Sequence, residues 1–213
     1  SGPKSLEISM QWKIDTGGCV DASPLVISYN SAESGDPKIV AFVGSHSHKF
    51  LAVDVASGEV LWTTETCDRI EAGACTFHGG RVIAVGAYDA AMYVIDAESG
   101  EILARHKVED VVKGNATLSP SGAMWFGSHG GGLHRLNPDG VLTQMAQLQG
   151  AVFATPAVLE QGNAIVAATT RGVLACLSTH EGTELWRVHL NQPVFSSPLP
   201  LDSGRGLVVA TVA

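Results

Sequence analysis

Residues Gly44 to Trp62, GSHSHKFLAVDVASGEVLW, define the unit on which the whole chain is built. Two apolar runs, 39–44 and 50–55, flank the polar segment 45–49, and a third apolar run begins at Val60 after a second turn. Apolar residues do not recur at helical spacing in this stretch. We therefore expect three consecutive β-strands joined by two tight turns.

The same unit recurs three more times along the chain. The copies are GAYDAAMYVIDAESGEILA from Gly86, GSHGGGLHRLNPDGVL from Gly127 and TTRGVLACLSTHEGTELW from Thr169. A glycine stands in the second turn of each copy, and by subtraction of their numbers these glycines lie 42, 40 and 42 residues apart. They are Gly58, Gly100, Gly140 and Gly182. A repeat of about 40 to 45 residues with four short strands has the size of one propeller blade.

We therefore predict an all-β fold, a β-propeller of four-stranded blades with quinoprotein-like repeats. We expect residues 1–8 to be a linker and residues 9–213 to form one domain. This domain should hold four whole repeats and partial repeats at both ends. Segments that begin at Asp21, Phe153 and Phe195 share a Ser/Thr-Pro pattern, and we expect each to be the first strand of a blade.

The incomplete repeats at the two ends leave two alternatives. Trp12 precedes Pro24 by the same 12 residues that separate Trp186 from Pro198, which predicts that Trp12 ends the last strand of an incomplete unit. The two ends could combine into one thin fifth blade. We favour a partial propeller instead, because a blade that lacks its third strand would leave edge groups unpaired.

Composition and charge narrow the function classes. Hydrophobic residues make up 45% of the chain and charged residues 16%, which excludes a disordered protein. The net charge of −8 disfavours nucleic acid and anionic membranes as partners. We find neither a signal peptide nor an apolar run of the roughly 18 residues that a membrane span needs, and the four cysteines lack metal-site spacing. We expect a cytoplasmic protein.

The second turn of the unit has a structural signature. Gly58 permits a positive φ, Asp54 can accept turn N–H groups, and Trp62 can pack between adjacent blades. The copies depart from this pattern at the Trp position of the second and third units and at the Asp position of the fourth, so even packing of those blades is in question. We assign structural roles to the equivalent residues of the other copies, Asp96, Gly100, Gly140, Gly182 and Trp186.

This turn pattern resembles the repeat of pyrroloquinoline-quinone-type propellers. Three further segments, VDASPLV, GSHSHKFLAVD and DRIEAGAC, resemble the C-terminal repeat domain of the beta-alanine-activating, aminoadipate-semialdehyde dehydrogenase-like acyl-CoA synthetase family. The resemblance implies a parent enzyme that uses ATP and a phosphopantetheine carrier. No residue of this chain matches the family's ATP or phosphopantetheine motifs, so we expect no cofactor in this stretch.

We find no catalytic or metal-binding constellation in the sequence. Two histidines, His46 and His48, have a spacing that metals can use, but they fall in a predicted turn. The string GSHSH lacks the last glycine of a nucleophile elbow. We expect the carboxylates of Glu71, Asp89, Glu109 and Asp110 to be solvated.

We therefore expect a non-catalytic domain that docks a protein partner or carrier domain of an acyl-adenylate-forming ligase. The predicted docking surface is a rim of first-turn loops, 45–49, 87–90 and 128–131. The alternative is a quinone- or metal-dependent oxidoreductase. The candidate rim residues are Ser45, His46, His48, Tyr88, Asp89 and His129.

Overall fold

The structure, a computed structural model, describes residues 9–30, 37–159, 162–201 and 206–212. The predicted linker over residues 1–8 lies outside them. Within the described part there is no helix that is long and apolar enough to cross a membrane.

The chain forms four successive antiparallel sheets of four strands, and each sheet is one blade. Blade 1 contains β1 (Leu25–Tyr29), β2 (Lys38–Gly44), β3 (Lys49–Asp54) and β4 (Val60–Glu65). Blade 2 contains β5 (Cys75–Phe77), the 3-10 turn η1 (His78–Gly80), β6 (Val82–Ala87), β7 (Ala91–Asp96) and β8 (Ile102–Lys107). Blade 3 contains β9 (Thr117–Leu118), β10 (Met124–Gly127), β11 (Gly132–Leu136) and β12 (Leu142–Gln147). Blade 4 contains β13 (Ala157–Leu159), β14 (Ala164–Ala168), β15 (Val173–Ser178) and β16 (Glu184–His189).

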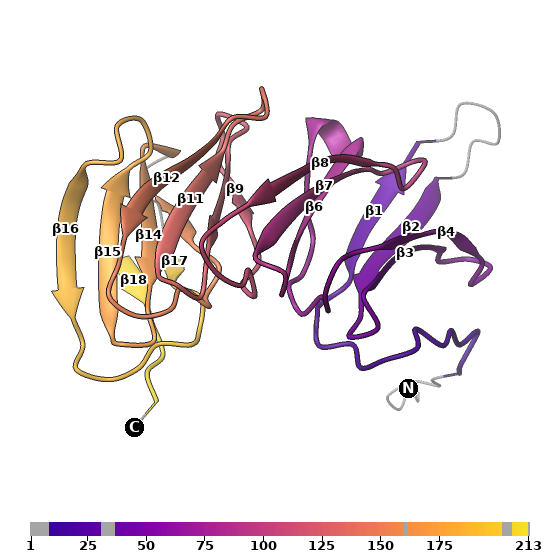
Figure 1. The fold of residues 1–213 in the computed structure, drawn as a ribbon, viewed down its shortest axis with the longest axis horizontal. Helices are drawn as coiled ribbons and strands as arrows, with labels where there is room; N and C mark the ends of the chain where they lie inside the picture. Colours follow the sequence, from indigo (N-terminus) through magenta and orange to yellow (C-terminus); the bar gives the residue numbers. More distant parts are fainter. Residues whose placement is uncertain (1–8, 31–36, 160–161, 202–205, 213) are drawn as a thin grey trace, which may run out of the picture.

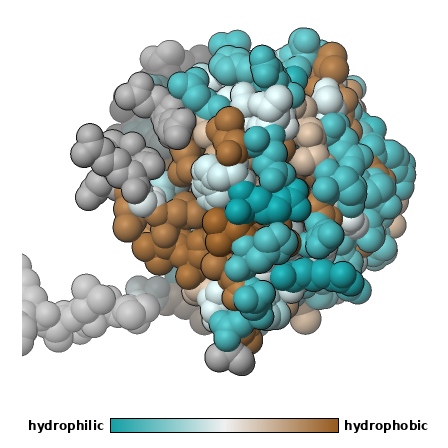
Figure 2. All heavy atoms as spheres, turned by 90° about the vertical axis from the view of Figure 1, so that its left-hand side faces the viewer, coloured by the Kyte–Doolittle hydropathy of each residue, from teal (hydrophilic) through white to brown (hydrophobic). Residues whose placement is uncertain are grey.

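A two-stranded sheet, β17 (Leu199–Leu201) with β18 (Gly206–Val208), follows blade 4. Blade 1 and this sheet lie at opposite ends of a row of blades (Figure 1), so they do not combine into one blade. The prediction of an all-β partial propeller is therefore confirmed. At the β16 end of the row, apolar side chains gather on the surface (Figure 2). The exposed apolar residues of the last strands are Leu185, Trp186 and Val188 of β16, and Leu199 and Leu201 of β17.

Two sequence predictions were wrong in detail. Residues 9–24 contain no strand, so Trp12 does not end one. The segment that begins at Asp21 is also not yet a strand, because β1 begins only at Leu25, and the same offset holds at Phe153 and Phe195. Where the entering chain follows another blade, one N–H just before the segment bonds to a turn of that blade and not to a strand, as Val152 N does to Ser128 O and Val194 N to Thr169 O.

The hydrophobic core lies between successive blades. One cluster joins Phe42 and Phe50 of blade 1 to Ile83 and Tyr93 of blade 2, and further clusters join blades 2 and 3, blades 3 and 4, and blade 4 and the β17–β18 sheet. The middle strands are therefore buried on both faces, as in β14, where every residue is buried. Continuous apolar runs such as AIVAA follow from this double burial.

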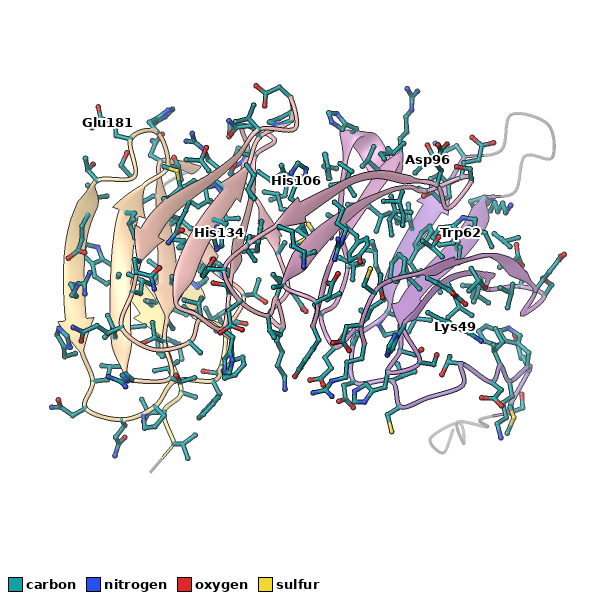
Figure 3. The ribbon with its side chains drawn as sticks, in the orientation of Figure 1. Lys49, Trp62, Asp96, His106, His134 and Glu181 are labelled. Atoms are coloured by element: carbon teal, nitrogen blue, oxygen red, sulfur yellow. The ribbon has the colours of Figure 1, made fainter. Side chains whose placement is uncertain are left out.

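A tryptophan on the outer strand links blade 1 to blade 2. The indole N–H of Trp62 donates to the Ala97 carbonyl at 3.1 Å, beside the turn of Asp96 (Figure 3). Its ring leaves no room for a side chain at Gly100, where an added Cβ would lie 2.7 Å from the ring. Trp12 repeats this contact on blade 1, because its indole donates to the Val55 carbonyl at 2.8 Å.

The contacts between the outer strands of the other neighbouring blades, which we call seams, differ from this one, as the departures in the sequence suggested. Between blades 3 and 4, Arg135 donates to the Thr179 carbonyl at 2.8 Å, while Met145 lies against Gly182. Between blades 2 and 3 the Trp position holds Ala104, and an added Cβ at Gly140 would meet nothing within 4 Å. The seam between blades 2 and 3 therefore lacks the tryptophan contact.

These differences make a matched pair of substitutions informative. Gly100 and Gly140 both have positive φ, 76° and 84°, so alanine at either site costs about 1 kcal/mol in backbone strain. Gly100→Ala must also displace the Trp62 ring, so we expect it to lower the free energy of unfolding by about 2 kcal/mol more than Gly140→Ala does. Urea unfolding of both variants measures this difference. Equal losses would contradict the role of the Trp62 contact.

Candidate functional site

A repeated backbone bridge builds one face of the molecule. In each blade the turn after the second strand receives an N–H from the segment that enters the next blade. The bridges are Ile70 N to Ser45 O at 3.0 Å, Val112 N to Ala87 O at 3.3 Å, Val152 N to Ser128 O at 3.0 Å and Val194 N to Thr169 O at 3.2 Å. We call the surface formed by the four turns, 45–49, 87–90, 128–131 and 169–172, and by the entry segments the rim face.

The residue after each bridging N–H, the entry residue, differs sharply between blades. Most of these residues contact a ring from the preceding turn. His46 Nε2 lies 3.5 Å from Glu71 Oε1, and the ring centroid of His129 lies 4.8 Å from that of Phe153. The backbone bridge is thus the same in each repeat, while the side chain of the entry residue varies. The entry residues, in chain order, are Glu71, Lys113, Phe153 and Phe195, and Asp21 stands at the equivalent place in the sequence before blade 1.

Glu71 is the centre of an ionic network on the rim face. Its side chain is 6% exposed, and Oε1 accepts from Arg69 Nε at 2.9 Å. Oε2 accepts from Lys113 Nζ and from Tyr88 Oη, both at 2.8 Å. Burial by itself would raise the pKa of Glu71, but the hydrogen bonds of Lys113 and Tyr88 and the two positive charges outweigh it and lower that pKa.

A metal site at this network has to be considered. Asp21, His46 and Glu71 each offer one ligand atom, and these atoms lie within 4.8 Å of one another. However, both oxygens of Glu71 already bind cationic side chains, Arg69 and Lys113, which a metal ion would have to displace. We therefore assign the cluster to an ion-pair network and not to a metal site.

The structure separates the predicted rim residues into two groups. Those with surface on the rim face are His46, His48, His129 and Tyr88. His48 has a positive φ of 67°, at the turn position where the blade 3 and blade 4 turns have glycine.

The remaining two predicted rim residues face inward. Ser45 is fully buried, and its hydroxyl pairs with that of Ser47 at 2.7 Å. The Asp89 carboxylate is 8% exposed and accepts from Tyr93 and Arg105. These two residues serve the fold and are not available to a partner.

Sequence reasoning assigned Glu71 and Asp89 to solvated edges, and this was wrong, because both carboxylates are nearly buried among hydrogen-bond donors. It also did not single out Lys113 as a site residue, nor Phe153 and Phe195 beyond their place in a predicted strand. One signal could have found Glu71, Lys113, Phe153 and Phe195. Each of these four residues directly follows an aliphatic residue, buried in the structure, that occupies the same place in its repeat.

The structure also brings together Ser128, His134 and Glu109. Ser128 Oγ lies 3.4 Å and Glu109 Oε2 3.0 Å from the same ring nitrogen, Nε2 of His134, and Ser128 also donates to Glu109. A catalytic triad needs the serine and the carboxylate on opposite nitrogens of the histidine. Ser128 is moreover fully buried. The cluster therefore does not fit nucleophilic catalysis.

This buried cluster should make stability depend on pH. Burial lowers the pKa of His134 from its usual 6.5, and the weaker effect of Glu109 does not reverse this. Burial also lowers the pKa of His106. Since the unfolded chain binds these protons first, stability is full above about pH 6.5 and falls as the pH drops, by at most about 1.4 kcal/mol per pH unit for each histidine.

We expect His134→Gln to reduce this loss between pH 7 and pH 5, because glutamine keeps a hydrogen bond to Glu109 but does not titrate. Urea unfolding at several pH values measures the slope. His180→Gln, at an exposed turn, is the matched control. An unchanged slope in His134→Gln would show that His134 does not carry the effect.

Comparison with known proteins agrees with this architecture. The family model described as "Beta-alanine-activating enzyme, beta-propeller" matches residues 16–213. The human beta-alanine-activating enzyme is 43% identical over 94 residues, which cover 44% of this chain and 8% of the human protein. The Drosophila melanogaster enzyme is 23% identical over 203 residues, which cover 93% of this chain and 19% of the fly protein. The chain thus spans less than a fifth of the length of these relatives.

Among solved structures, BamB from Moraxella catarrhalis has a similar fold. The TM-score is 0.68 and the sequence identity 18%, over 89% of this chain and 58% of the BamB chain. At this identity the likeness concerns the fold alone. Taken with the family model, which covers nearly the whole chain and its repeated blades, these findings show that the chain belongs to the β-propeller family of the beta-alanine-activating enzymes.

Proposed function

We propose that this propeller is a non-catalytic docking domain that binds a carrier domain or another protein through its rim face. The parent protein would be a cytoplasmic ligase that uses ATP to activate a carboxylic acid, such as beta-alanine, as an acyl-adenylate and loads it on a phosphopantetheine thiol. The family membership supports this parentage. The binding step would fall to the propeller and the chemistry to other domains.

One observation carries the proposal. The backbone bridges of the rim face repeat in all four blades, while the entry residues change from carboxylate to ammonium to aromatic ring. The repeat itself does not require this sequence of side chains, because all of them occupy the same backbone environment. A surface with its own arrangement of charges and rings is what selective recognition of a protein partner needs.

A protein partner also fits the charge of the chain better than the other macromolecules do. The net charge of −8 opposes general binding to nucleic acid or to anionic membranes. The alternative, a quinone- or metal-dependent oxidoreductase, receives no support from the comparisons. The Asp21, His46 and Glu71 cluster is better explained by its two cationic partners than by a bound metal.

The test uses the whole parent enzyme. We expect the double substitution His48→Ala and His129→Ala to slow the loading of the carrier by about tenfold, since both side chains are about half exposed on the rim face and a contact residue of this kind typically contributes on the order of 1 kcal/mol. Acyl-adenylate formation in the separate ATP–pyrophosphate exchange assay should not change. Loading of the carrier with radiolabelled beta-alanine measures the effect.

Leu103→Ala is the matched control, because Leu103 is 52% exposed on the outer strand β8, away from the rim face. The free propeller chain should also bind its partner more weakly when it carries the two rim substitutions. If the rim variant loads its carrier at the normal rate and keeps every partner interaction, the docking proposal is wrong.

A further inference from the structure

The rim face is divided into a closed half and an open half. In the closed half, Glu71 is saturated by its ion pairs. In the open half, the entry segments of blades 3 and 4 and of the β17–β18 sheet line an open pocket of about 500 Å³. It is lined by three segments that occupy equivalent places in their repeats, Lys113 to Asn115, Phe153 to Thr155, and Phe195 with Ser197.

One wall of the pocket is aromatic. The rings of Phe153 and Phe195 are stacked with a centroid separation of 6.0 Å and an interplanar angle of 25°. Phe195 is 53% exposed, so part of its apolar surface faces solvent. A third ring placed against this pair would bury that surface and extend the stack, an arrangement that aromatic side chains favour.

The polar groups of the pocket still have hydrogens to donate, while some of their acceptors are in use. Asn115 Oδ1 accepts from Gly73 N at 2.6 Å, so its NH₂ group remains to donate. Ser197 Oγ accepts from Thr155 N at 3.1 Å, which leaves its hydroxyl hydrogen for another partner.

Lys113 adds a positive charge to these donors. Its ammonium has three protons, and even with Glu71 and Tyr88 as partners one remains to donate; the ammonium lies 5.6 Å from the centre of the Phe153 ring. Its side chain is 44% exposed. The pocket therefore combines an aromatic wall with donors and a cation, and the complementary group is a ring beside a carboxylate.

We infer that this pocket binds a segment of the partner protein that carries an aromatic side chain next to an acidic one. The inference rests on the proposed docking function and names the chemistry of the partner at that same surface. The pocket is lined by entry residues of the rim face, so a docked partner reaches it directly. The ring stacks on Phe153 and Phe195, and the carboxylate accepts from Lys113, Asn115 and Ser197.

Three blocked peptides test the inference on the full chain. The probe is acetyl-Gly-Asp-Phe-Asp-Gly-amide. One control replaces both aspartates with lysine, and the other replaces the phenylalanine with alanine. In amide NMR titrations we expect the probe to shift signals of the pocket backbone, such as Gly114 and Thr155, and to bind at least about fivefold more tightly than either control. Higher salt should weaken its binding.

Substitutions in the protein locate the site. Phe195→Ala and Lys113→Gln should each weaken binding of the probe by about fivefold or more, while Leu103→Ala should leave it unchanged. The exposed position of Phe195 makes its variant safe for the fold, and the dispersion of the NMR spectrum confirms this. Equal binding of the three peptides, or full binding to both pocket variants, would overturn the inference.

The inference and the proposed function can fail separately. If the carrier or partner still binds and depends on His48 and His129, but the probe peptide does not bind, then docking stands and the stated partner chemistry is wrong. If the rim substitutions change neither partner binding nor carrier loading, the docking function itself is wrong.

Discussion

The structure depends on how closely successive blades approach at the rim face. Each sheet is apolar on both faces, so it is stable only when it is covered by its neighbours. The approach is close enough for a backbone hydrogen bond between Ser45 and Ile70 because Gly44 has no side chain, and a Cβ there would lie 2.2 Å from Ile70. Gly86 and Gly127 meet the next blade in the same way. The packing of each entry segment against the preceding blade thus buries apolar surface and also pairs backbone polar groups.

Within each repeat, the residues that make this contact are different from the residue whose side chain can vary. A buried aliphatic residue packs against a small residue at the end of the second strand, which is glycine in blades 1 to 3 and Ala168 in blade 4, so the entry residue that follows can change without changing the backbone. Glu71, Lys113 and Phe153 illustrate the result, since an acid, a base and an aromatic ring stand at equivalent positions. Functions on propellers are therefore expected in the side chains of the rim and not in the fold itself.

The side chains that join the outer strands of neighbouring blades also vary from one seam to the next. The contact of Trp62 with Gly100 in one seam is replaced by Arg135 and Met145 in another. In repeat proteins each unit is stabilised mainly by its neighbours, so one weaker seam can be tolerated when the others are strong. The cores between the blades remain continuous at every seam, which explains why the loss of a tryptophan does not interrupt the row.

The sequence by itself determined the blades and their turns. The spacing of Gly58 and its equivalents, the alternation of apolar runs and turns, and the acceptor role of Asp54 are local, since hydrogen bonds within a few residues enforce them. The prediction of a rim of turns also followed from repetition.

Only the tertiary structure decided which of those rim residues are exposed on the rim face. Ser45 turned inward because its hydroxyl is used within the turn, and Glu71 became nearly buried because Lys113, from the next blade, lies beside it. The pocket beside Phe153 and Phe195 likewise needs three entry segments about 40 residues apart in the chain. Side chains that belong to different blades meet only after the blades pack, so no local pattern specifies their contacts.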